Sequence, residues 1–284
     1  MPKIILLTAL AMIAFAANSL LTRLALGQGL LDAATFSTVR MVSGAIMLSI
    51  ILLVKTPSEK LLPKKPDWRS PLMLFIYMTF FSFAYLSLAA GTGALILFGA
   101  VQLTMFLVAL KGGERFSPVS WAGLALAAGG LVYLVSPGLT APDPLGAVLM
   151  AGAGIAWGVY SLLGRGAADP LLATARNFIL SVPLVLGVSV LFLGSFDATV
   201  NGILLAIASG AVTSGIGYVI WYAALPGLTA GRAATVQLSV PVIAALGGVL
   251  FLQELVTTRL AIAAIATLGG VAIVLAQRAV KKPG

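Results

Sequence analysis

The segment from Tyr218 to Glu254, with the sequence YVIWYAALPGLTAGRAATVQLSVPVIAALGGVLFLQE, decides the fold class of this chain. It contains two apolar runs separated by Pro226-Gly227, a dipeptide that is typical of turns. An apolar run of about 20 residues is long enough to cross a hydrocarbon core of about 30 Å. The second run contains Pro241, which cannot donate a backbone hydrogen bond and bends or breaks helices. We therefore interpret the segment as the end of one transmembrane helix, a tight turn, and a second transmembrane helix broken in its middle.

The landmarks of this segment recur in the first half of the chain in the same order, which indicates an internal duplication. The matching pairs are Ser19-Leu20-Leu21-Thr22-Arg23 with Ser161-Leu162-Leu163-Gly164-Arg165, Arg40 with Arg176, Val101-Gln102-Leu103-Thr104 with Val236-Gln237-Leu238-Ser239, and Glu114 plus Gly129-Gly130 with Glu254 plus Gly269-Gly270. We expect two repeated units, residues 1–137 and 143–284.

The composition is that of an integral membrane protein. Apolar residues make up 60% of the chain, charged residues 9%, and the mean hydropathy is +1.11, whereas soluble domains carry about 25% charged residues. Unbroken apolar runs indicate helices, because every backbone polar group in lipid must be satisfied within its own segment. We predict an all-α fold with ten transmembrane helices, at approximately 4–26, 32–54, 70–90, 93–110, 117–136, 143–164, 171–194, 199–224, 229–252 and 256–277.

The basic residues predict the orientation of these helices. Arg23, Arg40 and Arg259 fall on one side of the membrane, and the other 14 of the 17 basic residues fall on the opposite side. Since positively charged loops stay in the cytoplasm, we expect a multi-pass protein of a bacterial inner membrane with both termini cytoplasmic. Five helices per unit is an odd number, so the two units are inverted relative to each other. The net charge of +9 is explained by this orientation and does not indicate a nucleic-acid partner.

The chain contains no Cys and no His, which argues against an enzyme. Disulfides, most zinc sites and catalytic triads need one of these residues. Ser214-Gly215 resembles the nucleophile of an intramembrane serine protease, but its histidine partner is absent. Ala14-Phe15-Ala16 resembles a signal-peptide cleavage site, yet the apolar run continues beyond it, so we expect it to stay uncleaved. No enzymatic activity, cofactor or metal is implied.

The two five-helix repeats, with Tyr222-Ala223-Ala224-Leu225, Pro241, Glu254 and a glycine-rich last helix, resemble the EamA type of the drug/metabolite transporter superfamily. The chain resembles most closely the bacterial exporters of aromatic amino acids. The first repeat departs from the pattern, with Phe106 in the place of Pro241 and five fewer residues between the glutamine and glutamate landmarks. This difference leaves open whether both halves bend alike.

The resemblance implies a secondary transporter that exports small amphiphilic metabolites, with aromatic and other amino acids as the favoured substrates, by alternating access. The alternatives are an importer or exchanger of another small metabolite, or a non-transport scaffold that handles lipids. The partners are then a small-molecule substrate and the lipid bilayer. Gly154-x-x-x-Gly158 is typical of close helix packing; we interpret it as internal packing and expect a monomer.

Polar and aromatic residues near mid-membrane are the candidate substrate-binding residues, because polar groups there usually face a cavity or a partner helix. Gln102 and Gln237 are related by the repeat; they could bind a zwitterion or hydrogen-bond across helices to hold the fold. Phe15 and Trp157 are likewise related, with Asn18 one turn beyond Phe15. These pairs predict one central cavity near the midplane.

Three further residues complete the candidates. Tyr77 begins a four-residue aromatic stripe that continues through Phe81 and Tyr85, and it could stack on a substrate or pack against other helices. Arg40 lies roughly 12 Å inside its helix, at 1.5 Å per residue; it could bind a carboxylate or extend to the headgroups, and we slightly favour the headgroups. Pro241 is the candidate gating residue. All eight carboxylates fall in loops or at helix ends, so we do not expect proton-coupled transport.

Overall fold

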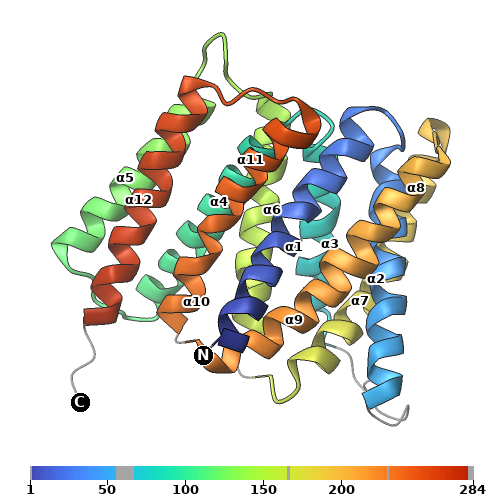
Figure 1. The fold of residues 1–284 in the computed structure, drawn as a ribbon, viewed down its shortest axis with the longest axis horizontal. Coiled ribbons are helices and arrows are strands. Elements are labelled where there is room, and N and C mark those ends of the chain that lie inside the picture. Colours follow the sequence, from blue (N-terminus) through green and yellow to red (C-terminus); the bar gives the residue numbers. More distant parts are fainter. Residues whose placement is uncertain (1, 56–66, 165–166, 229, 281–284) are drawn as a thin grey trace.

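The computed structural model describes residues 2–55, 67–164, 167–228 and 230–280, and these residues are almost entirely helical (Figure 1). The first half contains α1 (Pro2–Gly27), α2 (Ala33–Lys55), α3 (Arg69–Ala84), α4 (Ala90–Lys111) and α5 (Pro118–Val135). The second half contains α6 (Pro144–Leu163), α7 (Pro170–Leu191), α8 (Val200–Ile207), η3 (Ala208–Ile216), α9 (Gly217–Ala224), α10 (Ala230–Gln237), α11 (Ser239–Leu252) and α12 (Thr258–Val280).

The prediction of ten spans is confirmed. Among the described residues, nine helical segments are long and apolar enough to cross a membrane, and α3, with 16 residues, is a shorter apolar helix. Helix α3 ends at Ala84, six residues before the predicted boundary at 90. The chain tightens there, because Tyr85 N donates to Ser82 O at 3.1 Å and Leu86 N to Phe83 O at 3.3 Å, bonds that span three residues instead of four.

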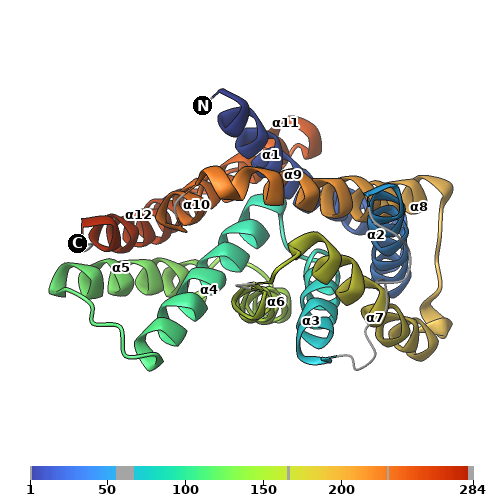
Figure 2. The ribbon, with the colours of Figure 1, turned by 90° about the horizontal axis from the view of Figure 1, so that it is seen from below.

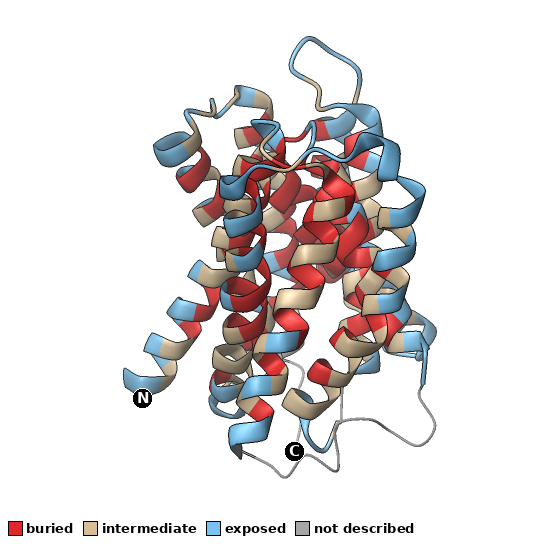
Figure 3. Ribbon diagram, turned by 90° about the vertical axis from the view of Figure 1, so that its right-hand side faces the viewer, coloured by how far each residue is buried: buried red, intermediate tan, exposed pale blue. Residues whose placement is uncertain are grey.

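The helices alternate in direction, so that α1 begins and α12 ends at the same end of the bundle (Figure 1). At the opposite end, hydrogen bonds join the two halves. Asp32 N donates to Asp197 O at 2.9 Å, and Arg259 Nη1 donates to Leu134 O at 3.3 Å. Seen from below, α5 and α12 lie side by side at one edge of the bundle and α2 and α7 at the other (Figure 2). Buried residues concentrate in the interior (Figure 3).

Helices α4 and α6 pack closely through glycine. A Cβ atom on Gly154 would lie 2.5 Å from Leu97 O, and one on Gly158 would lie 3.0 Å from Thr104 Cβ. Both glycines of this motif therefore face α4 of the same chain, as the interpretation of internal packing requires.

The eighth span is continuous but irregular. Residues Ala208–Ile216, between α8 and α9, form the π-helix η3. Gly210 of η3 packs against the backbone of α2, where a Cβ atom would lie 2.1 Å from Arg40 O, so a larger residue cannot fit without moving a helix. Wide turns of this kind occur often at functional sites. Here the π-helix lies in the interior, with Ser209, Thr213 and Ser214 buried.

The ninth span is broken, as Pro241 predicts, and the break lies at Leu238. Helix α10 ends at Gln237 and α11 begins at Ser239. The proline has no N–H to donate to the carbonyl of Gln237, four residues earlier, and its ring crowds that carbonyl. The corresponding helix of the first half, α4, runs without interruption from Ala90 to Lys111. The two halves therefore do not bend alike.

Candidate functional site

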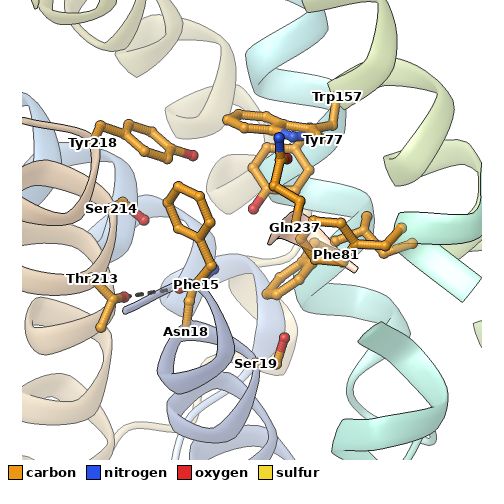
Figure 4. Close-up of a pocket in the computed structure, with 12 residues that line it drawn as sticks. Phe15, Asn18, Ser19, Tyr77, Phe81, Trp157, Thr213, Ser214, Tyr218 and Gln237 are labelled. Carbon is orange, nitrogen blue, oxygen red and sulfur yellow. Dashed lines mark hydrogen bonds between the residues drawn. The ribbon is translucent and has the colours of Figure 1, made fainter. Parts of the chain in front are cut away.

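A small cavity lies between the two halves of the chain, near the middle of the helices that surround it (Figure 4). The open space is about 20 Å³, which is room for about one water molecule. Helices α1, α3, α4, α6, α9 and α10 and the π-helix η3 supply the lining residues, which are Phe15, Asn18, Ser19, Tyr77, Phe81, Leu97, Phe98, Trp157, Thr213, Ser214, Tyr218 and Gln237.

Aromatic rings form one continuous wall of the cavity. The ring centroids of Tyr77 and Trp157 are 4.8 Å apart, and those of Trp157 and Tyr218 are 5.5 Å apart and nearly parallel. Phe15 meets Tyr218 edge to face at 5.9 Å. Tyr77 and Phe81, which the four-residue spacing places on one face of α3, are in tilted contact, with ring centroids 5.6 Å apart. Rings held in offset and edge-to-face contact present a rigid apolar surface to a ligand.

Hydroxyl and amide groups, most of them on α1 and η3, form a second, polar wall of the cavity. Asn18 Oδ1 accepts hydrogen bonds from Ser209 Oγ at 2.6 Å and from Thr213 Oγ1 at 3.2 Å, which joins α1 to η3. Ser214 lines the cavity, and its buried Oγ has no hydrogen-bond partner in the described part of the chain. An unsatisfied buried hydroxyl is unfavourable unless a ligand or water bonds to it. This wall can therefore offer hydrogen bonds to a polar group inside the cavity.

The two repeat-related glutamines occupy different environments. Gln237 lines the cavity at the end of α10, next to the break, and its Nε2 donates to Ala233 O at 3.2 Å. Gln102, in the middle of α4, is half-buried and is not among the lining residues. The expectation that both glutamines face one cavity thus holds for Gln237 and not for Gln102. The uninterrupted α4 turns Gln102 away, and it places Leu97 and Phe98 on the wall instead.

The interpretation that Arg40 extends to the headgroups is wrong. Its side chain is fully buried, with 0% of the residue exposed. Nη2 donates to the hydroxyl of Tyr77 at 3.2 Å, and the guanidinium carbon lies 4.7 Å from the centroid of the Phe81 ring. The backbone carbonyl of Arg40 packs against Gly210 of η3. The side chain lies directly behind the aromatic wall.

An ion pair joins the two halves at the end of the bundle opposite the N-terminus of α1. Arg23 Nε, in the last turns of α1, lies 3.1 Å from Glu254 Oε1, after α11. Arg23 Nη1 also donates to Tyr85 O and Leu86 O, each at 3.2 Å, and Glu254 Oε2 accepts from Ala90 N at 2.8 Å. The pair therefore links α1 and the residue after α11 to the α3–α4 turn.

Five of the seven predicted binding residues therefore line the cavity: Phe15, Asn18, Tyr77, Trp157 and Gln237. Sequence reasoning missed the contribution of η3 and α9. The sequence could have indicated this contribution. Thr213 lies four residues after Ser209, and Tyr218 five residues after Thr213, in a span that is mostly apolar. That pattern is typical of a polar stripe on one helix face.

Among the described residues that line the cavity there is neither a carboxylate nor a basic residue. Nothing in it combines a nucleophile with a base, which a hydrolytic site requires. What it can do is surround a flat apolar group with rings and bind a polar group at its hydroxyl and amide wall.

Comparison with known proteins agrees with this arrangement. The model of the EamA-like transporter family matches residues 2–136 and again residues 144–276. The chain is 48% identical over 277 residues to the uncharacterized protein PA1977 of Pseudomonas aeruginosa, covering 97% of this chain and 96% of that protein. A crystal structure with 20% sequence identity superposes with a TM-score of 0.68 over 98% of this chain and 99% of the other, which shows the same fold. The chain is therefore a multi-pass membrane protein that belongs to the EamA-like transporter family, a family of transporters and not of enzymes.

Proposed function

We propose that this transporter exports small amphiphilic metabolites that carry a flat apolar group, with aromatic amino acids as the first candidates. The observation that supports this substrate class is the cavity between the halves, where Tyr77, Trp157 and Tyr218 line the same space as Asn18, Ser214 and Gln237. Transporters built from inverted repeats bind their substrates at such a position, near the bilayer midplane. Aromatic rings suit a planar side chain, and the hydroxyl and amide groups suit its polar end.

The cavity must widen before it can hold an amino acid. Its open space of about 20 Å³ is much smaller than the pockets that bind drug-sized ligands, roughly 300 to 1,000 Å³. We propose that the two repeated units, residues 1–137 and 143–284, move apart first at one end and then at the other, which is alternating access. The Arg23–Glu254 pair keeps one end closed in the present conformation.

Transport by the purified protein in liposomes tests this function. Liposomes containing only this protein should take up radiolabelled phenylalanine and tryptophan faster than leucine, and leucine faster than glycine. Protein-free liposomes give the background, and Trp157→Ala is the matched control for the aromatic wall. Uptake of none of these amino acids would contradict the proposal, and the absence of flux for any small metabolite would favour the lipid-handling scaffold.

We propose further that transport is not coupled to protons. No acidic residue lines the cavity, and the chain contains no histidine. Flux should follow the substrate gradient, and collapsing a pH gradient should leave the initial rate nearly unchanged. Accumulation of substrate against its own gradient after an imposed pH step would overturn this part of the proposal.

The proposed location is a bacterial inner membrane with both termini in the cytoplasm, as the distribution of basic residues indicates. A reporter fused after Gly113, between α4 and α5, should lie in the cytoplasm. A reporter fused after Gly138, between α5 and α6, should lie outside. A cytoplasmic signal after Gly138 would contradict the orientation.

A further inference from the structure

The guanidinium of Arg40 is a buried cation, and no carboxylate among the residues that the structure describes forms an ion pair with it. It has 0% exposure, and neither the Arg23–Glu254 pair nor the Arg69–Asp67 pair includes it. Its Nε and Nη1 atoms are buried and have no hydrogen-bond partner within residues 2–55, 67–164, 167–228 and 230–280. These two nitrogens carry three N–H bonds. A charged group at membrane depth is costly unless it is paired, and for that reason such residues usually mark a functional site.

This cation adjoins the substrate cavity. Its Nη2 donates to the hydroxyl of Tyr77, and its guanidinium carbon lies 5.5 Å from the Tyr77 ring centroid and 4.7 Å from the Phe81 ring centroid. Both rings line the cavity. One layer of side chains therefore separates the charge from the open space. Since no carboxylate lines the cavity, the protein itself supplies no acidic group to neutralise Arg40 there.

We propose that Arg40 and Tyr77 form a carboxylate subsite, at which the carboxylate of the substrate becomes the missing counter-charge. This inference rests on the proposed transport function, because it takes the cavity to be the place where substrate binds. The unpartnered Nε and Nη1 groups donate to the carboxylate once the Phe81 ring turns aside. The Tyr77 hydroxyl accepts from Arg40 and so keeps its own O–H to donate to the second carboxylate oxygen.

The subsite gives the transporter a charge selectivity that aromatic rings alone do not provide. Tyrosine and tryptophan faces attract cations, so an aromatic cavity by itself would accept an aromatic amine. A fixed guanidinium behind the wall repels an ammonium group and attracts a carboxylate. Aromatic carboxylates and zwitterions are therefore substrates, and aromatic amines without a carboxylate are not.

Three probes with the same ring test the proposal: L-phenylalanine, 3-phenylpropionate and phenethylamine. Their binding is measured by calorimetry on the full-length protein in lipid nanodiscs. The wild type should bind the two carboxylates about tenfold or more tighter than the amine. Arg40→Met should weaken both carboxylates about 10- to 100-fold, as loss of hydrogen bonds to a charged group does, without weakening the amine. Arg40→Lys should retain part of the affinity.

Arg259→Met is the matched control. Arg259 donates to backbone carbonyls, among them those of Leu134 and Pro137, at the outer end of the bundle and away from the cavity. Its replacement removes an arginine from the same protein but should change the affinity of none of the three probes. A change in all variants alike would report on stability and would overturn the assignment to Arg40.

The outcomes separate the subsite from the transport function. If folded Arg40→Met binds 3-phenylpropionate as tightly as the wild type, the subsite is wrong, whereas transport of phenylalanine can still stand. If 3-phenylpropionate binds in an Arg40-dependent manner but phenylalanine neither binds nor moves, the amino acid function fails and the subsite stands. If neither carboxylate binds the wild type, both fail. If Arg40→Met does not fold, Tyr77→Phe decides, because unchanged affinity for both carboxylates would overturn the subsite.

Discussion

The two halves differ most in the helices that face each other across the cavity. In the first half, α3 and α4 are regular, and α4 runs unbroken from Ala90 to Lys111. In the second half, the corresponding spans contain the π-helix Ala208–Ile216 and the break at Leu238. Both irregular segments lie at the cavity, since Ser214 and Gln237 line it. The first half therefore lines the cavity with regular helices, whereas the second half lines it in part with segments whose α-helical hydrogen bonding is interrupted.

The comparison teaches that a shared sequence pattern does not impose a shared shape. The repeat-related residues occur in the same order in both halves. The second half, however, contains Pro241 and has five more residues between its glutamine and glutamate landmarks, and its span is divided into α10 and α11. Helices kink most readily at a proline or at a π-helical turn, and the second half has both at the cavity. We therefore expect the second half to carry the larger part of the movement that opens the cavity and to supply more of the polar contacts with the substrate.

The glutamine pair gives the largest expected difference between the halves. Gln237→Ala should weaken an amino acid substrate by about 1.5 to 3 kcal/mol, the usual cost of losing a hydrogen bond to a charged group. Gln102→Ala should change affinity by less than about 0.5 kcal/mol, as substitutions away from such features do. Binding of phenylalanine to both purified variants checks the prediction. Equal losses would mean that the cavity widens in the transport cycle until it includes Gln102.

The aromatic pair should show a smaller asymmetry. Trp157 contacts Tyr77, Tyr160 and Tyr218 at the centre of the aromatic wall, so Trp157→Ala should weaken an aromatic substrate by about 1 to 3 kcal/mol through lost apolar contact. Phe15→Ala removes a smaller ring and should cost about half as much. Leucine should respond less than phenylalanine to either change. If all substrates lose equally, the ring that binds them lies elsewhere, and Tyr77 is the next candidate.

The sequence predicts the architecture well because the membrane leaves few alternatives. Apolar run length, turn dipeptides and the repeated landmarks yield ten helices in two units. At the site, the distance of a residue from the ends of its helix predicts its depth in the bilayer. Phe15, Trp157 and Tyr77 could therefore be assigned to the middle of the bilayer. Which face a residue presents is harder, because all faces of a helix such as α4 are apolar and no periodicity distinguishes them.

Two features lay beyond sequence reasoning for specific physical reasons. The π-helix depends on tertiary packing: at Gly210 the backbone meets that of α2, and no local propensity encodes this contact. Burial of Arg40 contradicts the ordinary preference of arginine for the headgroups. Only the position of α2 between η3 and α3 places its guanidinium against Tyr77 and Phe81, so the sequence alone favoured the wrong alternative.

The proline of the ninth span should affect the rate more than the affinity. Pro241→Ala restores a backbone donor for the carbonyl of Gln237 and should straighten the span. We expect turnover in liposomes to fall about tenfold, which is about 1.4 kcal/mol, with substrate affinity changed by less than a factor of about three. Pro183→Ala is the matched control, because Pro183 lies inside α7 and does not line the cavity. Unchanged turnover for Pro241→Ala would make the break a passive packing feature.

The smallest expected effects come from the turns that precede the two repeated glutamates. Gly113 has φ of 84° before Glu114, and Gln253 has φ of 56° before Glu254. Both residues are exposed, so their substitution tests the backbone alone. The left-handed conformation costs a residue with a Cβ atom roughly 1 to 2 kcal/mol relative to glycine. Gly113→Ala should therefore lower the melting temperature in detergent, by an amount equivalent to about 1 kcal/mol.

Gln253→Gly is the reciprocal change and should raise the melting temperature. The gain should be less than about 1 kcal/mol, because glycine also loses more entropy on folding than other residues. If Gly113→Ala lowers the melting temperature and Gln253→Gly raises it, both halves use the same left-handed turn, and the second half tolerates backbone strain at Gln253. A lower melting temperature for Gln253→Gly would instead mean that the Gln253 side chain holds the turn beside the Arg23–Glu254 pair. In that case the two turns would differ in kind, as the helices that precede them do.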